Sequence, residues 1–133
     1  MSRYVDPAEQ LVAEIVVSDI RRSVEFYRRL GFVLLRDGGD FVELTWEDHR
    51  LFLAGRSAFH GADHGEAPSP PPFPPVNIRV MVPAVDDLWR LANEIGARIV
   101  VPVADRYYGL RDFMIADPDG IGVRFAFILE EIP

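Results

Sequence analysis

The sequence has no cysteine and only three histidines in 133 residues. Without cysteine, disulfide bonds and thiolate metal sites are excluded, and nothing in the chain argues for secretion. No apolar run approaches the ~20 residues that a helix needs to span a bilayer. The N-terminus lacks the basic and then apolar pattern of a signal peptide. We therefore expect a cytoplasmic protein that does not enter a membrane.

Positive charge is also scarce, because 14 Lys and Arg stand against 21 Asp and Glu, for a net charge of −7. A nucleic-acid-binding protein needs a basic surface, so this balance argues against such a partner. The chain also lacks a glycine-rich phosphate loop and a Gly-x-Ser-x-Gly nucleophile elbow. Apolar residues are plentiful, at 49% of the sequence, which is enough for a hydrophobic core.

The chain contains one pattern twice. Ile15 corresponds to Val80 and Gly31 to Gly96, so the offset is 65 residues. Each copy has an apolar strand, an amphipathic helix ended by glycine, a further strand and a hairpin. The repeat predicts an α+β fold of two tandem β-α-β-β-β modules, with each helix covering one face of a sheet.

The boundaries of the modules follow from the proline distribution. Six of the eleven prolines lie between Pro68 and Pro75. We expect a single domain over residues 1–133, in which module one spans about 10–55 and module two about 76–128. Residues 56–75 then form a stiff, loop-like linker.

Strand alternation separates the two faces of each sheet. In the first strand Ile15 and Val17 should pack under the helix, which turns Glu14 to the open face. In the hairpins we expect Trp46 opposite His49, and Met114 opposite Val123. A one-residue slip would invert these faces. The polar and aromatic residues that this prediction places on the open faces are Glu14, Phe41, Glu43, Arg50, Phe52, Asn77, Arg79, Arg111, Phe113 and Arg124.

Charges on a concave sheet face are costly to desolvate unless they pair with each other or touch a ligand. Two interpretations follow. The open faces form a polar ligand cavity walled by aromatic rings, or their charges satisfy one another in ion pairs such as Glu14–Arg79. The histidines give no clear metal site. His60 and His64 have a spacing that suits a helix, but they lie in a glycine-rich stretch, and we interpret them as exposed loop residues.

Several strings of this sequence carry a resemblance to a known family. These are Val17-Ser18-Asp19-Ile20, Phe26-Tyr27, Leu30-Gly31-Phe32, Tyr108-Gly109-x-Arg111-x-Phe113 and Asp117-Pro118-Asp119-Gly120. Over about residues 10–128 the chain resembles the vicinal oxygen chelate superfamily, which includes glyoxalase I, extradiol dioxygenases, fosfomycin-resistance enzymes and bleomycin-resistance proteins. The resemblance implies the tandem β-α-β-β-β fold.

Enzymes of that superfamily hold a divalent metal on four inward strand positions. The resemblance places these positions on Val12, about Phe52, Asn77 and Arg124. Valine and phenylalanine cannot ligate a metal, arginine would repel it, and asparagine alone is a weak ligand. We therefore expect no metal and no cofactor. The chain looks more similar to the bleomycin-resistance branch, whose members sequester a drug in crevices between the subunits of a dimer.

That branch implies a metal-independent small-molecule binding protein, a homodimer that sequesters an antibiotic or an aromatic metabolite. Aromatic contacts would come from Trp46, Phe52, Tyr107 and Tyr108, and polar groups would be oriented by Arg111 and Arg124. Four arginines against two glutamates on the predicted open faces favour an anionic or neutral ligand over cationic bleomycin.

Two alternatives remain open. The first is a lyase, isomerase or dioxygenase-like enzyme of the same superfamily, with Glu14 or Glu43 as general base beside arginines that stabilise an enolate. The second is a module without a small ligand, whose open sheet face is a dimer interface.

Overall fold

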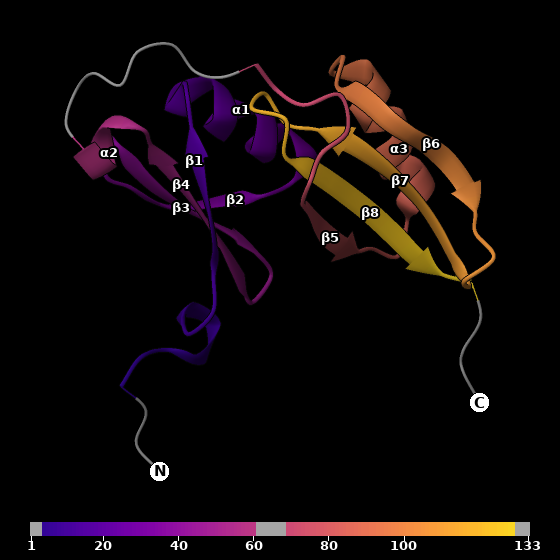
Figure 1. The fold of residues 1–133 in the computed structure, drawn as a ribbon. Helices are drawn as coiled ribbons and strands as arrows, with labels where there is room; N and C mark the ends of the chain where they lie inside the picture. The colour runs from indigo at the N-terminus through magenta and orange to yellow at the C-terminus, as the bar shows by residue number, and fades with distance from the viewer. Residues whose placement is uncertain (1–3, 61–68, 130–133) are drawn as a thin grey trace. The chain divides into compact units, whose positions relative to one another are not determined.

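Each copy of the repeat folds around its own four-stranded sheet (Figure 1). The computed structural model describes residues 4–60 and 69–129. The chain divides into two units, Met1–Pro68 and Ser69–Pro133, and each is described by itself.

The first unit begins with a 3-10 turn at Pro7–Glu9, ahead of its sheet. Its other elements are β1 (Ala13–Val17), α1 (Ile20–Leu30), β2 (Val33–Asp37), β3 (Phe41–Trp46), β4 (His49–Gly55) and α2 (Ser57–His60). The strand order is β1-β4-β3-β2, with β1 parallel to β4 and the other pairs antiparallel. The one-turn helix α2 lies where the sequence predicts loop, so that part of the prediction is wrong.

The second unit repeats the arrangement. Its elements are β5 (Asn77–Met81), α3 (Val85–Glu94), β6 (Arg98–Asp105), β7 (Leu110–Ala116) and β8 (Gly122–Ile128). The strand order is β5-β8-β7-β6, with β5 parallel to β8. The predicted α+β fold of two β-α-β-β-β modules is confirmed. No helix in the described ranges is long and apolar enough to cross a membrane.

Helix α1 forms where the sequence predicts it, for identifiable reasons. The Asp19 side chain caps its N-terminus by accepting a hydrogen bond of 3.1 Å from the amide of Arg22. Gly31 ends it with a left-handed φ of 117°, which glycine adopts without a steric penalty. Between these ends Val24, Tyr27 and Leu30 are buried, so one apolar stripe packs towards the sheet.

The first hairpin has the predicted register. Trp46 lies opposite His49, Leu44 opposite Leu51 and Val42 opposite Leu53. The paired residues Val42, Leu44, Leu51 and Leu53 are buried on the side of α1. Because strand faces alternate, Glu43, Arg50 and Phe52 lie on the open face.

The second hairpin is shifted by one residue from the predicted register. Met114 lies opposite Arg124 and Ile115 opposite Val123. The reason is the side chain of Asp117, whose Oδ1 accepts hydrogen bonds from the amides of Asp119 (2.8 Å) and Ile121 (2.9 Å). Ile121 therefore belongs to the turn, and Gly122 is the first residue of β8 paired with β7.

This shift corrects two predicted positions. Phe113 does not lie on the open face with Arg124, since it is 0% exposed and its ring packs against Trp89 of α3, with centroids 5.3 Å apart. Arg111 also lies towards α3, where its Nε donates to Asp86 (2.9 Å). Asp112 takes the place on the open face that the prediction gave to these two residues.

Candidate functional site

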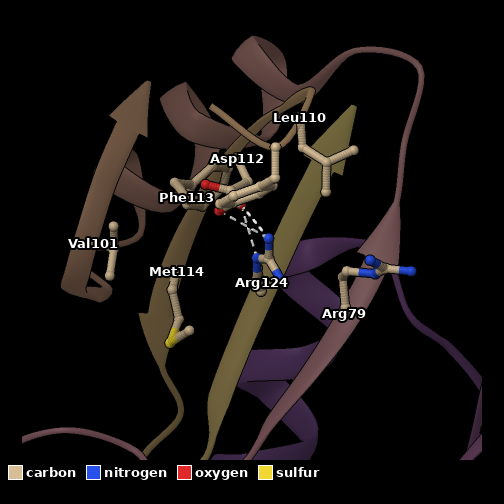
Figure 2. Close-up of a pocket in the computed structure, with 8 residues that line it drawn as sticks. Arg79, Val101, Leu110, Asp112, Phe113, Met114 and Arg124 are labelled. Atoms are coloured by element: carbon tan, nitrogen blue, oxygen red, sulfur yellow. Dashed lines mark hydrogen bonds and ion pairs between the residues drawn. The ribbon is translucent and has the colours of Figure 1, made fainter. Parts of the chain in front are cut away.

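A pocket of about 410 Å³ lies on the open face of the second sheet (Figure 2). Its floor comes from three adjacent strands, because the register places Arg79 of β5 beside Arg124 of β8, and Arg124 beside Met114 of β7. The lining residues are Arg79, Val101, Tyr108, Leu110, Asp112, Phe113, Met114 and Arg124. Aliphatic, thioether and aromatic walls thus surround a small charged centre.

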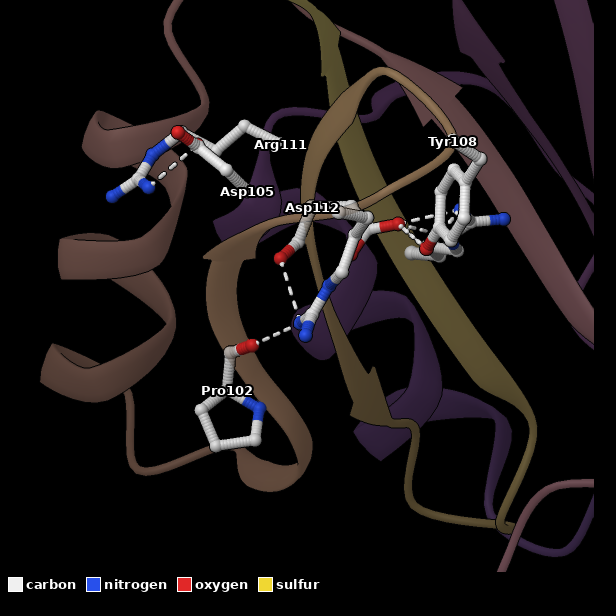
Figure 3. Close-up of polar contacts among 7 residues, drawn as sticks. Pro102, Asp105, Tyr108, Arg111 and Asp112 are labelled. Carbon is white, nitrogen blue, oxygen red and sulfur yellow. Dashed lines mark hydrogen bonds and ion pairs between the residues drawn. The ribbon is translucent and has the colours of Figure 1, made fainter.

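The charged centre is built around Asp112, which is 3% exposed. Its Oδ1 accepts a hydrogen bond from Arg106 Nε at 2.7 Å (Figure 3). Its Oδ2 accepts from the Tyr108 hydroxyl at 2.7 Å and from Arg124 Nε at 2.9 Å. A buried carboxylate is stable in its charged form only when its oxygens are satisfied in this way.

These contacts set the protonation states of the cluster. Burial acts to raise the pKa of Asp112, but the hydrogen bonds from Tyr108, Arg106 and Arg124 outweigh it, and the net pKa lies below its ordinary value. Burial, followed by the hydrogen bond to Asp112, raises the pKa of Tyr108. Tyr108 therefore stays a neutral phenol that donates a proton to the carboxylate.

Arg124 is held on two sides. Besides Asp112, its Nη2 donates to the Tyr108 hydroxyl at 3.0 Å. Its guanidinium carbon lies 5.5 Å from the centroid of the Tyr108 ring, within the range of a cation–π contact. Arg106 is anchored separately, since its Nη2 donates to the backbone carbonyl of Pro102 (Figure 3).

Arg79 differs from both of these arginines. It is exposed, and it has no hydrogen bond or ion pair with residues 69–129 of its own unit. In Figure 2 its guanidinium lies at the side of the pocket, away from Asp112. The pocket therefore has one fixed arginine and one unpaired arginine.

The predicted residues of the first unit share the open face of their own sheet. The register places Phe52 beside both Glu14 and Glu43, and Arg50 beside Thr45. Glu43 is 6% exposed, and its Oε2 is at an ion-pair distance of 2.7 Å from Arg36 Nε, although the N–H is not aligned for a hydrogen bond. The Nε of Arg50 is buried and has no hydrogen-bond partner among the described residues.

The remaining predicted residues have different surroundings. Trp46 packs against Phe32, with ring centroids 5.1 Å apart, and approaches Gly31 at the end of α1. Tyr107 is fully exposed in the β6–β7 connection. Asn77 is exposed on β5, on the same face as Arg79. Among the predicted ligand contacts, the pocket thus brings together Arg79, Tyr108, Phe113 and Arg124.

Asp112 is the residue that sequence reasoning missed. It stands between Arg111 and Phe113, and the shifted register assigned it to the helix side of the sheet. The signal that could have found it is the Asp117 side chain, because an aspartate that bonds two later amides lengthens a turn. Arg106, which reaches Asp112 from the same connection as Tyr107, was missed with it.

The side chains at the family's metal positions do not fit a divalent ion. Phe52 stacks edge-on against Phe41 with centroids 5.2 Å apart, and Arg124 is bound to Asp112. Within the described residues no three His, Cys, Asp or Glu side chains gather as a metal site would need. His64 lies outside the described residues. The chemistry of the pocket therefore rests on guanidinium, carboxylate and phenol groups.

Comparison with known proteins agrees with this fold. A family model described as "Glyoxalase/Bleomycin resistance protein/Dioxygenase superfamily" matches residues 9–125. A search of curated proteins found no match.

Three similar structures share the fold at low sequence identity. TioX from Micromonospora sp. ML1 is 22% identical, with a TM-score of 0.72 over 90% of this chain and 98% of that one. A glyoxalase/bleomycin resistance protein/dioxygenase from Nocardioides is 21% identical, with a TM-score of 0.72 over 96% and 88%. A bleomycin-binding protein complexed with bleomycin is 17% identical, with a TM-score of 0.65 over 90% and 98%.

Proposed function

Because the chain belongs to the glyoxalase/bleomycin resistance protein/dioxygenase superfamily, we propose that it is a metal-independent small-molecule binding protein. In this proposal a cytoplasmic homodimer sequesters an antibiotic or an aromatic metabolite. The observation that carries the proposal is the pocket of the second unit, which combines apolar walls with a fixed Asp112–Arg124 centre.

The dimensions and lining of the pocket support ligand binding. Ligand sites commonly have volumes of roughly 300–1,000 Å³ with mostly apolar walls and a few convergent polar groups. The volume of about 410 Å³ lies within this range. Val101, Leu110 and Met114 supply apolar walls, and the Tyr108 ring supplies a surface on which a flat ligand stacks.

The polar centre supports binding better than turnover. A general base needs a lone pair that is free to take a proton. The Asp112 oxygens are already occupied by Tyr108, Arg106 and Arg124. The other candidate bases, Glu14 and Glu43, belong to the first unit, where Glu43 already pairs with Arg36. We therefore favour sequestration over a lyase or isomerase reaction.

The bleomycin-binding neighbour supports the class of function but not the identity of the ligand. Its name records binding of bleomycin, and at 17% identity the likeness to this chain is one of fold. The class of ligand that this chain binds depends on the side chains of its own pocket.

A variant whose larger side chain fills the pocket tests the proposal. Val101 is half-buried and lies on the pocket wall (Figure 2). Replacing Val101 by tryptophan is expected to weaken binding of naphthalene-type probes at least about tenfold, the equivalent of 1.4 kcal/mol. The measurement is isothermal titration of the full chain in the presence of a chelator.

Val33→Trp provides the matched control, because Val33 is 61% exposed on β2 of the first unit. The control variant should bind as the unchanged protein does. Equal binding by all three proteins would overturn the assignment of this pocket as the ligand site. Binding that disappears on addition of the chelator would overturn the metal-independent mechanism.

A further inference from the structure

The carboxylate in the pocket is unavailable to a ligand cation. An ionised carboxylate offers roughly four acceptor positions. The Asp112 oxygens already accept from four donors of the protein itself: Arg106 Nε, the Tyr108 hydroxyl, and Nε and Nη2 of Arg124. It is also 3% exposed. A cationic ligand could pair with Asp112 only by breaking these hydrogen bonds.

Positive charge is in surplus around this carboxylate. Arg79 and Arg124 both line the pocket, and Arg106 binds Asp112 from the adjacent connection. Arginine stays protonated at all relevant pH values. Among residues 69–129, three guanidinium groups therefore stand against one carboxylate at this centre, which is cationic even though the whole chain has a net charge of −7.

Arg79 carries a charge that residues 69–129 leave uncompensated. It lies directly beside Arg124 in the β5–β8 register. Like charges on facing positions of neighbouring strands destabilise a sheet. Arg124 is neutralised by Asp112, whereas Arg79 has no ion-pair partner among residues 69–129 of the same unit. An anion bound beside Arg79 would supply the counter-charge that these residues do not.

We propose that the pocket selects ligands that carry one anionic group on a flat apolar body, with Arg79 as the residue that determines this specificity. The inference rests on the proposed binding function and adds the class of ligand. The anionic group is a carboxylate, sulfonate or phosphate that pairs with the Arg79 guanidinium. The apolar body lies against Val101, Leu110 and Met114 and stacks on Tyr108.

Three probes of nearly equal shape test this selectivity: 2-naphthoate, neutral 2-naphthamide and cationic 2-naphthylmethylamine. Isothermal titration of the full chain at pH 7 should give the tightest binding for 2-naphthoate. Because an ion pair between a carboxylate and a guanidinium is stronger than a hydrogen bond from a guanidinium to a neutral amide, we expect a preference over the amide of at least about tenfold. The amine should bind most weakly.

Variants at position 79 separate charge from shape. Arg79→Gln should reduce the preference for 2-naphthoate over 2-naphthamide to within about twofold, because the pairing between the guanidinium and the anionic group is lost. Arg79→Lys keeps the charge and should retain most of the preference. The control Arg90→Gln alters an exposed arginine of α3, which pairs with Asp87, and should behave as the unchanged protein.

The outcomes distinguish the inference from the proposed function. Equal affinity of the unchanged protein for 2-naphthoate and 2-naphthamide, or a preference that survives in Arg79→Gln, would overturn the anion selectivity and leave the binding function standing. Tighter binding of the amine would overturn it as well. Failure of all three probes to bind would overturn the proposed function itself.

Discussion

Replacing Phe113 by alanine is expected to lower the free energy of unfolding by about 3 to 5 kcal/mol. The side chain is 0% exposed, and its ring lies against Trp89 and Phe125 with centroids 5.3 and 5.6 Å away. Removing the ring leaves a cavity between α3 and the sheet, because two strands and a helix cannot close fully around it. Urea denaturation of the full chain, followed by circular dichroism, measures the loss.

Phe127→Ala is the matched control for this prediction. Phe127 lies on the same hairpin but is 38% exposed near the end of β8. Its replacement should cost less than about 1 kcal/mol, since exposed side chains contribute little to stability. A loss for Phe113→Ala no larger than that for Phe127→Ala would contradict the observed register and favour the one predicted from the sequence.

Replacing Asp112 by asparagine is expected to destabilise the protein by about 2 to 4 kcal/mol, because it leaves two partly buried guanidinium groups without their counter-charge. The side chains of Arg106 and Arg124 are only 24% and 21% exposed, so solvent screens them incompletely. Denaturation of both proteins at pH 7 measures the difference. Glu43→Gln in the first unit removes another buried carboxylate and serves as a comparison.

This effect should depend on pH in a defined direction. The pKa of Asp112 is lower in the folded protein than its ordinary value. The unfolded chain therefore takes up the proton first as the pH falls. The stabilisation is complete above the unfolded pKa of about 3.9 and is lost as the pH falls through the folded value. The difference between the two proteins should thus be constant from pH 5 to 7 and shrink below about pH 4. A difference that grows on acidification would contradict the charged state of Asp112.

The fold could be predicted from the sequence because its signals are local and occur twice. Apolar residues at helical spacing, the Asp19 cap and the Gly31 stop define α1. The repeat carries the apolar spacing and the glycine to α3, whose N-cap residue Ala84 makes no side-chain hydrogen bond. The first hairpin could also be predicted. Its two-residue connection at Glu47-Asp48 leaves one register that puts Val42 and Leu44 opposite apolar partners.

The second hairpin could not be predicted from alternation alone. Apolar residues stand on both faces of β7, since Phe113, Met114, Ile115 and Ala116 are all buried. A continuous apolar run fits either register. The outcome depends on side-chain bonds of Asp117 within the turn. The one-residue error in register placed Arg111 and Phe113 on the open face and Asp112 on the helix side. The prediction therefore did not include the charged centre of the pocket.

Ion pairing in the second unit could not be predicted either, because it depends on the register of the second hairpin. The described ion pairs include Arg36–Glu43 in the first unit and Arg124–Asp112 in the second. The predicted pair Glu14–Arg79 would join residues of different units, and it stays a prediction. Of the predicted site residues, Arg79, Tyr108, Phe113 and Arg124 line the pocket. The face of Phe113 was nevertheless predicted wrongly, because its ring packs against Trp89 of α3. Their role in binding a ligand stays a prediction.

The most direct measurement maps where a ligand binds. Chelator-treated, ¹⁵N-labelled protein is titrated with 2-naphthoate, and the amide resonances are followed by nuclear magnetic resonance. A pocket on the open face of the second sheet predicts saturable shifts at Arg79, Val101 and Arg124, with little change at Phe41 and Phe52 of the first unit. Saturable shifts confined to the first unit, or none without added metal, would contradict metal-independent binding at this site.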